Sequence, residues 1–142
     1  GQTLSEHWQE GLRTFQRLTS HGFPNCFFLG FTQTAVTVNV PHALNEQAKH
    51  VAHILQTARD RGTPRVEPTA QAEEDYVQEI AKSANVGARF YAECTPGYYN
   101  SEGKRGNRSG FFSDMHSAGA IKFFKLLKDW RDEGSLEGLD LS

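Results

Sequence analysis

Apolar residues recur at helical spacing in three separate stretches of this chain. In the stretch from His42 to Arg61, they occur at steps of four and three, and Gly62 and Pro64 follow. This spacing lines one face of a helix, which the glycine and proline then end. The pattern predicts an amphipathic helix with the following residues on its buried face: Leu44, Ala48, Val51, Leu55 and Ala58.

Two further helices are predicted later in the chain. Thr69 follows Pro68 and is suited to cap a helix whose early turns are acidic, with Glu73, Glu74 and Asp75. Its expected buried stripe is Ala72, Tyr76, Ile80 and Ala84. The third helix is predicted from Ala118 to Glu133 and ends at Gly134. Its apolar positions are Ala120, Phe123, Phe124, Leu127 and Trp130.

Strand signals are few and short. A turn cluster over 21–25 precedes Cys26 to Leu29, which is predicted to be a fully buried strand closed by Gly30. The stretch from Leu12 to Thr19 fits a strand or a short helix, with a strand favoured at its end. Residues 65–67 are interpreted as an extended link, and Leu136 to Leu141 as a small terminal strand.

No period survives between Asn85 and Met115. Pro96 and the glycines at positions 97, 103, 106 and 110 mark a long irregular loop in this region. A loop of this length is usually functional or disordered, and the stretch from Thr95 to Gly110 is predicted to be the most mobile. The fold class is therefore α+β, with short buried strands, three amphipathic helices and a long irregular loop.

Composition excludes several functions but suggests none. The formal charge is -2, from 15 basic and 17 acidic residues, which favours neither a nucleic acid nor a membrane surface as partner. The only cysteines, Cys26 and Cys94, form no disulfide or zinc pattern, and no apolar run could span a membrane. We expect a cytoplasmic protein of one domain.

The motifs of common enzyme sites are missing or weak. The sequence contains no GxGxxG, no complete phosphate-binding loop and no GxSxG. His42, His50 and His53 have a spacing that could share a metal, but no carboxylate or thiol completes a convincing set, so ordinary helix residues are the stronger interpretation. The basic stretch from Lys104 to Arg108 could contact an anion, although such loops are usually just solvated.

Two longer segments are recognisable. They are His21 to Gln33 (HGFPNCFFLGFTQ) and Glu93 to Lys104 (ECTPGYYNSEGK). Together with the order of the motifs between and after them, they resemble the C-terminal region of Baeyer-Villiger monooxygenases of the cyclohexanone and cyclopentadecanone type. The resemblance covers essentially the whole chain.

The resemblance implies a parent enzyme that holds FAD and NADP(H) on two Rossmann-type domains and inserts oxygen next to a ketone carbonyl. This chain would be the C-terminal part of that α/β flavoprotein, inactive alone and without bound cofactor, because it lacks both glycine-rich nucleotide motifs. The implied divisions are an edge of the FAD domain (1–34), a helical segment (35–94), a mobile loop (95–117) and a C-terminal helix with tail (118–142).

The same resemblance assigns individual residues. FAD contacts would be Gly30, Thr32, Gln33 and Thr34, where a helix N-terminus faces the flavin. In the loop that covers NADP and substrate, the cofactor contacts would be Tyr98, Asn100 and Lys104, and the substrate contacts Tyr98 and Tyr99. This chain has a Tyr-Tyr pair where the cyclohexanone type has a Trp.

Partners follow from these assignments. They would be the upstream FAD- and NADP-binding domains and a small ketone. An apolar surface around Phe27, Phe28, Phe31 and Val36, left uncovered without those domains, could also cause self-association. The alternative is a non-catalytic binding or structural module that kept this fold without the cofactor domains.

Overall fold

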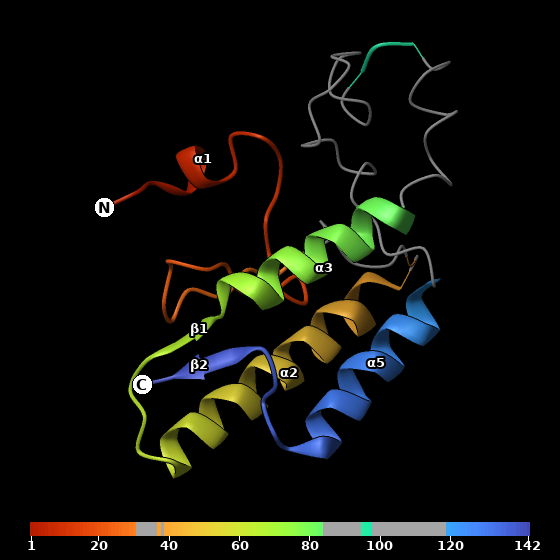
Figure 1. The fold of residues 1–142 in the computed structure, drawn as a ribbon. Coiled ribbons are helices and arrows are strands. Elements are labelled where there is room, and N and C mark those ends of the chain that lie inside the picture. Colours follow the sequence, from red (N-terminus) through yellow and green to blue (C-terminus); the bar gives the residue numbers. More distant parts are fainter. Residues whose placement is uncertain (31–36, 38, 84–94, 98–118) are drawn as a thin grey trace.

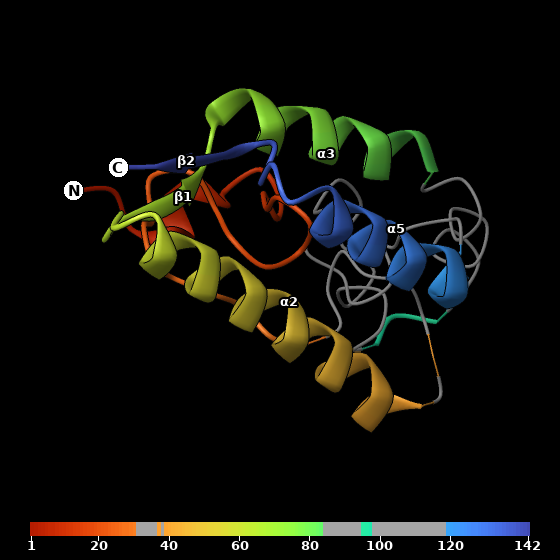
Figure 2. The same ribbon diagram turned by 90° about the horizontal axis from the view of Figure 1, so that it is seen from below.

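Three long helices and one two-stranded sheet organise the part of the chain that the structure describes. The computed structural model describes residues 1–30, 37, 39–83, 95–97 and 119–142. In chain order the elements are α1 (Leu4–His7), α2 (Val40–Asp60), β1 (Val66–Pro68), α3 (Ala70–Ser83), α5 (Gly119–Glu133) and β2 (Leu139–Leu141). Helices α2 and α5 pack side by side, and the small sheet lies between α2 and α3 (Figures 1 and 2).

Helix α2 forms where the periodicity predicted it, but it buries a different face. Asn39 caps its start, with Oδ1 accepting a hydrogen bond from the His42 backbone N-H at 3.2 Å. Of the five positions predicted to be buried, only Ala58 is; Leu44 and Leu55 are 37% and 46% exposed. The buried residues are Ala43, Gln47, His50, Ile54 and Ala58. Two of these, Gln47 and His50, are polar. The prediction assumed that only apolar residues are buried, and it therefore assigned the wrong face of α2 to the core.

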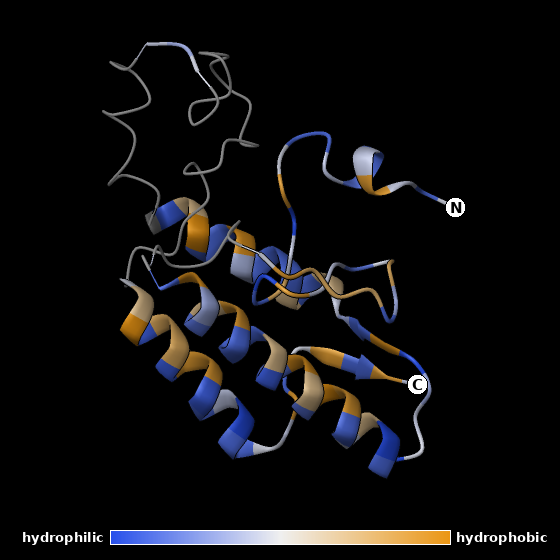
Figure 3. Cartoon of the chain, turned by 180° about the vertical axis from the view of Figure 1, so that it is seen from behind, coloured by the Kyte–Doolittle hydropathy of each residue, from blue (hydrophilic) through white to orange (hydrophobic). Residues whose placement is uncertain are grey.

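Helices α3 and α5 agree more closely with the sequence. Thr69 caps α3 as predicted, because its Oγ1 accepts a hydrogen bond from the Ala72 backbone N-H at 3.1 Å. Tyr76 and Ile80 are buried, whereas Ala72 is half-buried and Ala84 lies outside the described residues. Figure 3 shows apolar and polar residues alternating around these helices, as expected for elements with one buried face.

The core consists of two neighbouring apolar clusters. One joins α3 to α5 through Tyr76, Ile80, Phe123 and Leu127. The other joins α2, the sheet and α5 through Ile54, Ala58, Val66, Trp130 and Leu136. Phe15 packs against both clusters. The predicted apolar positions Phe123, Leu127 and Trp130 of α5 are therefore confirmed as buried.

The sheet pairs the middle of the chain with its last residues. Strands β1 and β2 are antiparallel, with Val66 opposite Leu141 and Pro68 opposite Leu139. The pairing continues past the strands, because Arg65 and Ser142 exchange two backbone hydrogen bonds of 2.9 and 3.1 Å. The predicted extended link and terminal strand are thus two halves of one ladder.

Two predicted strands are wrong. Cys26 to Leu29 is not a strand in the structure and is not fully buried, since Leu29 is 55% exposed. Its one backbone hydrogen bond to a distant residue joins Phe28 N-H to Leu18 carbonyl, and a single bond does not make a ladder. In the region from Leu12 to Thr19, residues 12–14 are irregular and residues 15–19 form a tight turn with positive φ at Gln16 and Arg17, closed by a lone bridge between Phe15 and Thr19.

Among the described residues, no helix is both long enough and apolar enough to cross a membrane.

Candidate functional site

Gly30 is the one predicted cofactor contact that the described residues include. Its backbone N-H donates to Gln47 Oε1 at 3.0 Å, and its carbonyl accepts from Gln47 Nε2 at 2.8 Å. The Gln47 side chain comes from the third turn of α2 and is completely buried. The Gln47 amide therefore pairs with both backbone groups of one residue, which we call the Gly30-Gln47 junction.

The backbone conformation at position 30 favours a glycine. Its φ of +150° is one that other residues rarely adopt. A Cβ placed there would lie 2.9 Å from Arg17 Nη2, so the end of the Arg17 side chain would have to shift. The guanidinium of Arg17 is itself buried, and burial lowers the pKa of Arg17 to about 10. The backbone at Gly30 thus lies next to the buried guanidinium of Arg17.

The other predicted site residues lie outside the described part of the chain. They are Thr32, Gln33, Thr34, Tyr98, Tyr99, Asn100 and Lys104. The basic stretch from Lys104 to Arg108 and most of the predicted mobile loop lie outside it as well.

A second polar centre on α2 surrounds His50. Arg131 Nη1 lies 3.3 Å from His50 Nδ1, and because an arginine can only donate, Nδ1 is the acceptor. His50 Nε2 then carries the proton and donates to Gln16 Oε1 at 2.8 Å. Burial, and then the charge of Arg131, lower the pKa of His50 to about 3, so this imidazole stays neutral.

These contacts involve two of the three histidines whose spacing on the helix could share a metal. Both ring nitrogens of His50 are used by protein groups, and the His42 ring packs edge-on against Phe124 at 5.2 Å. Nowhere in the described ranges do three His, Cys, Asp or Glu side chains gather as metal ligands would. His50 is therefore a core histidine whose two ring nitrogens both have protein partners.

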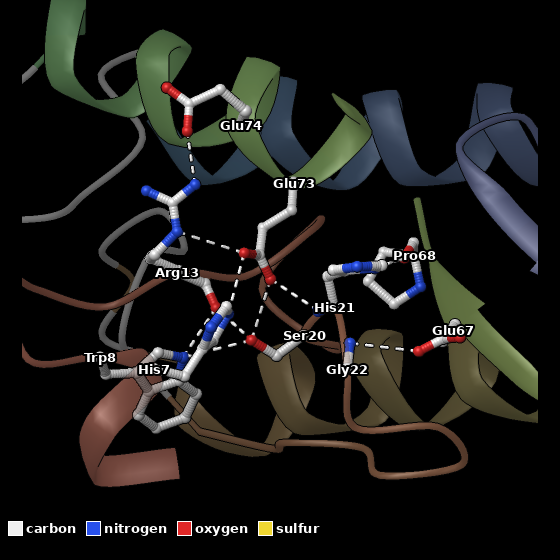
Figure 4. Close-up of polar contacts among 10 residues, drawn as sticks. All are labelled: His7, Trp8, Arg13, Ser20, His21, Gly22, Glu67, Pro68, Glu73 and Glu74. Carbon is white, nitrogen blue, oxygen red and sulfur yellow. Dashed lines mark hydrogen bonds and ion pairs between the residues drawn. The ribbon is translucent and has the colours of Figure 1, made fainter. Parts of the chain in front are cut away.

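The third polar centre, which the sequence did not reveal, is built around Glu73 at the start of α3 (Figure 4). Its Oε1 accepts from His7 Nε2 at 3.0 Å and from Arg13 Nε at 3.3 Å. Its Oε2 accepts from Ser20 Oγ at 2.9 Å and from the His21 backbone N-H at 2.7 Å. We call these five residues the Glu73 cluster.

The geometry of the Glu73 cluster argues for anchoring rather than chemistry. Glu73 is 2% exposed, and its two oxygens accept four hydrogen bonds from groups of the protein itself. Arg13 also pairs with Glu74, and that contact raises the pKa of Arg13. The acidic start of α3 was visible in the sequence, but its distant donors, which lie 52 to 66 residues away, were not.

Beside the Glu73 cluster lies a polar cavity of about 690 Å³. It is bounded by α1, the turn after it and the outer face of α3, and His7 and Arg13 form part of its wall. Since His7 and Arg13 both bind Glu73, the cavity wall offers no unsatisfied catalytic group from this cluster.

Comparisons with known proteins give one consistent result. Models of known protein families give no match. Neopentalenolactone D synthase of Streptomyces avermitilis is 43% identical over 141 residues, which is 99% of this chain and 24% of that protein. A Baeyer-Villiger monooxygenase of Streptomyces coelicolor is 45% identical over 134 residues, or 94% of this chain and 22% of that protein.

The solved structures agree with these relatives. The polycyclic ketone monooxygenase of Thermothelomyces thermophila superposes on 100% of this chain, with a TM-score of 0.87 and 37% identity, over 23% of its own length. The fold is thus that of one part of a flavin monooxygenase. Over essentially its whole length this chain is homologous to the C-terminal part of Baeyer-Villiger monooxygenases, and it spans about a quarter of the length of the relatives it matches.

Proposed function

We propose that this chain is the C-terminal part of an FAD- and NADPH-dependent monooxygenase that inserts oxygen next to a ketone carbonyl. The observation that carries the proposal is the match along 99% of this chain at 43% identity to an enzyme four times as long. The missing three quarters would supply the FAD- and NADP-binding domains as partners, and this chain alone would be inactive.

Two features of the described residues around the predicted FAD segment support the proposal. Leu29 beside this segment is 55% exposed, and Val40 and Leu44 at the start of α2 are 38% and 37% exposed, which leaves apolar surface for a further domain to cover. The first turn of α2 contains no acidic residue, so its positive end is not neutralised there.

Each part of the chain has a role in this proposal. Residues 1–34 form the edge of the FAD domain, and 35–94 the helical segment behind it. Residues 95–117 cover NADP and substrate, and 118–142 anchor the end. Bound FAD, reduced by NADPH, supplies the oxygen-inserting chemistry. The protein contributes the FAD contacts at Gly30, Thr32, Gln33 and Thr34, and the loop contacts at Tyr98, Tyr99, Asn100 and Lys104.

The first test is the coding sequence upstream of Gly1. The proposal expects it to continue in frame into two GxGxxG motifs, each between a strand and a helix. The full-length protein should then be yellow, oxidise NADPH in the presence of a polycyclic ketone, and give a product heavier by one oxygen atom, labelled from isotopic oxygen gas.

The proposal fails if the upstream sequence has no nucleotide-binding motifs, or if the full-length protein binds no FAD. Either result would favour the non-catalytic module. The chain produced alone serves as the control, because without the phosphate-binding turns it should not bind FAD measurably. Micromolar FAD affinity of the isolated chain, measured by fluorescence quenching, would contradict the expectation that the upstream domains supply the affinity for FAD.

A further inference from the structure

The Gly30-Gln47 junction has the hydrogen-bond pattern of strand pairing, although one partner is a side chain. In an antiparallel ladder, a residue donates its N-H and accepts at its carbonyl across the same pair. Gly30 does both with a single amide, at 3.0 and 2.8 Å. The junction therefore fixes the position of Gly30 and also the orientation of its peptide groups.

Both borders of the segment predicted to contact FAD are tied to the same helix. Gly30 begins that segment and is bound to Gln47 in the third turn of α2. Asn39 comes five positions after its last residue, Thr34, and caps the first turn of α2. Gln47 lies eight positions after Asn39, which is about 12 Å along the helix axis at the usual rise. The spacing between the two ends is thus set by rigid helix.

A buried amide is a poor choice if the only requirement is to fill space. An aliphatic side chain would fill the same space but would leave the Gly30 N-H and carbonyl without partners, and unsatisfied backbone groups are costly. Gln47 is completely buried and lies on the same face of α2 as Ala43 and Ile54. Directional bonding is what Gln47 offers at this position and an aliphatic side chain does not.

We propose that Gln47 is a positioning residue for the flavin: its double hydrogen bond holds the Gly30 backbone at the height and orientation that the flavin edge requires. This inference rests on the proposed function. Gln47 itself does not touch the cofactor, and it acts through Gly30, which is confined on its other side by Arg17.

The experiment compares three variants of the full-length enzyme. Gln47→Met keeps the length of the side chain and removes both hydrogen bonds. Gln47→Glu, measured above neutral pH, keeps the acceptor for the Gly30 N-H and loses the donor to the Gly30 carbonyl. The matched control is Asn25→Asp, because Asn25 makes the same kind of double contact, with the Pro64 carbonyl at 2.9 Å and the Val66 N-H at 3.0 Å, away from Gly30.

The first readout needs no cofactor. Hydrogen exchange at the Gly30 amide is measured in the apoenzyme by mass spectrometry with fragment-ion resolution. Gln47→Met should speed exchange there by about tenfold or more, since the N-H loses its acceptor. Gln47→Glu should have a smaller effect, and Asn25→Asp none. Equal exchange in the wild type and Gln47→Met would overturn the junction itself.

The second readout is the flavin. Gln47→Met should lower kcat/KM for the ketone by roughly ten- to a hundredfold, as misplacement near reacting groups does, and raise the share of NADPH electrons that end in hydrogen peroxide. It should also shift the visible absorption of bound FAD. Gln47→Glu should fall between wild type and Gln47→Met, and Asn25→Asp should match the wild type in all three properties.

Each remaining outcome is decisive. If exchange at Gly30 changes but the flavin spectrum, the peroxide share and kcat/KM do not, the positioning role is wrong while the proposed function stands. If Asn25→Asp changes these properties as much as Gln47→Glu, a general loss of stability explains both and the inference fails. If the wild-type full-length protein binds no FAD, the proposed function fails and the positioning role fails with it.

Discussion

The Glu73 cluster is built around a charge, whereas the Gly30-Gln47 junction is built from neutral amides. Glu73 accepts four hydrogen bonds from an arginine, a histidine, a serine and a backbone N-H, and holds residues 7–21 against α3. Gln47 makes two hydrogen bonds to one glycine. A buried carboxylate is costly to leave unpaired, and neutral groups much less so. The first centre should therefore govern stability, and the second should govern position.

The largest expected effect is at Glu73. Glu73→Gln removes the charge and turns an amide NH2 toward groups that donate, so the free energy of unfolding should fall by about 3 kcal/mol. Glu74→Gln, one residue further on the exposed side of α3, is the matched control and should change stability far less. Urea unfolding of both variants tests this. Equal losses would mean that the buried charge is not the anchor.

The next effect depends on pH and concerns His50, which shares the buried face of α2 with Gln47. Its pKa falls from an ordinary 6.5 to about 3 in the folded chain. Below pH 6.5 His50 is protonated in the unfolded chain but stays neutral in the folded chain. The free energy of unfolding therefore declines as the pH falls from neutral toward 3. At pH 5 the loss should be about 2 kcal/mol.

The control for this pH dependence is His50→Gln, which cannot titrate. The groups around His50 are Arg131 on α5, His53 on α2 and the neutral Gln16, with Glu46 paired to Arg131 at 3.5 Å. Unfolding measured between pH 7 and 5 should be less pH-dependent in the variant. Parallel curves for wild type and variant would show that the pKa of His50 is the same in the folded and the unfolded chain.

A smaller loss of stability is expected at the Gly30-Gln47 junction. Gln47→Met should lower the free energy of unfolding by about 1 kcal/mol, because methionine fills the space while the Gly30 groups lose their partner. The measurement is urea unfolding under the conditions used for Glu73→Gln. A loss as large as that of Glu73→Gln would remove the distinction between an anchoring centre and a positioning centre.

The smallest effect is expected on the outer face of α5. Lys128 and Asp132 form an ion pair one turn apart, and both side chains are well exposed. Water screens such pairs, so Lys128→Gln should leave the unfolding midpoint within experimental error. Thermal unfolding at low and high salt checks this. A clear fall of the unfolding midpoint at low salt would show that this exposed ion pair contributes to stability, contrary to the expectation.

The three helices could be predicted from sequence because their period is a local property. The buried face of α2 could not, because Gln47 and His50 are buried through contacts with Gly30, Gln16 and Arg131, which lie far along the chain. Cys26 to Leu29 failed as a strand for a related reason: an apolar run predicts burial, but a strand also needs a neighbour.

The candidate site contains one residue that the sequence pointed to. Gly30 was assigned as an FAD contact by resemblance, and that role stays a prediction; its positive φ explains why the residue is a glycine. Gln47 was inside a predicted helix, where a glutamine between apolar positions looks like an ordinary solvated residue. A polar residue on the i, i+3, i+4 track of buried residues would have been the signal. The donors of Glu73 carried no such signal, because their spacing has no period.

The pairing of β1 with β2 has a consequence for the order of folding. Helices α2 and α3 flank β1 closely in sequence and can form from local contacts as soon as those residues are available. The ladder cannot form from local contacts, because Val66 pairs with Leu141 and both α3 and α5 lie between these two residues in the sequence. Closing so long a loop is entropically costly, so helix formation should come early and the ladder late in folding. Val66 and Leu136, which complete one of the two apolar clusters, would then become buried only in that last step.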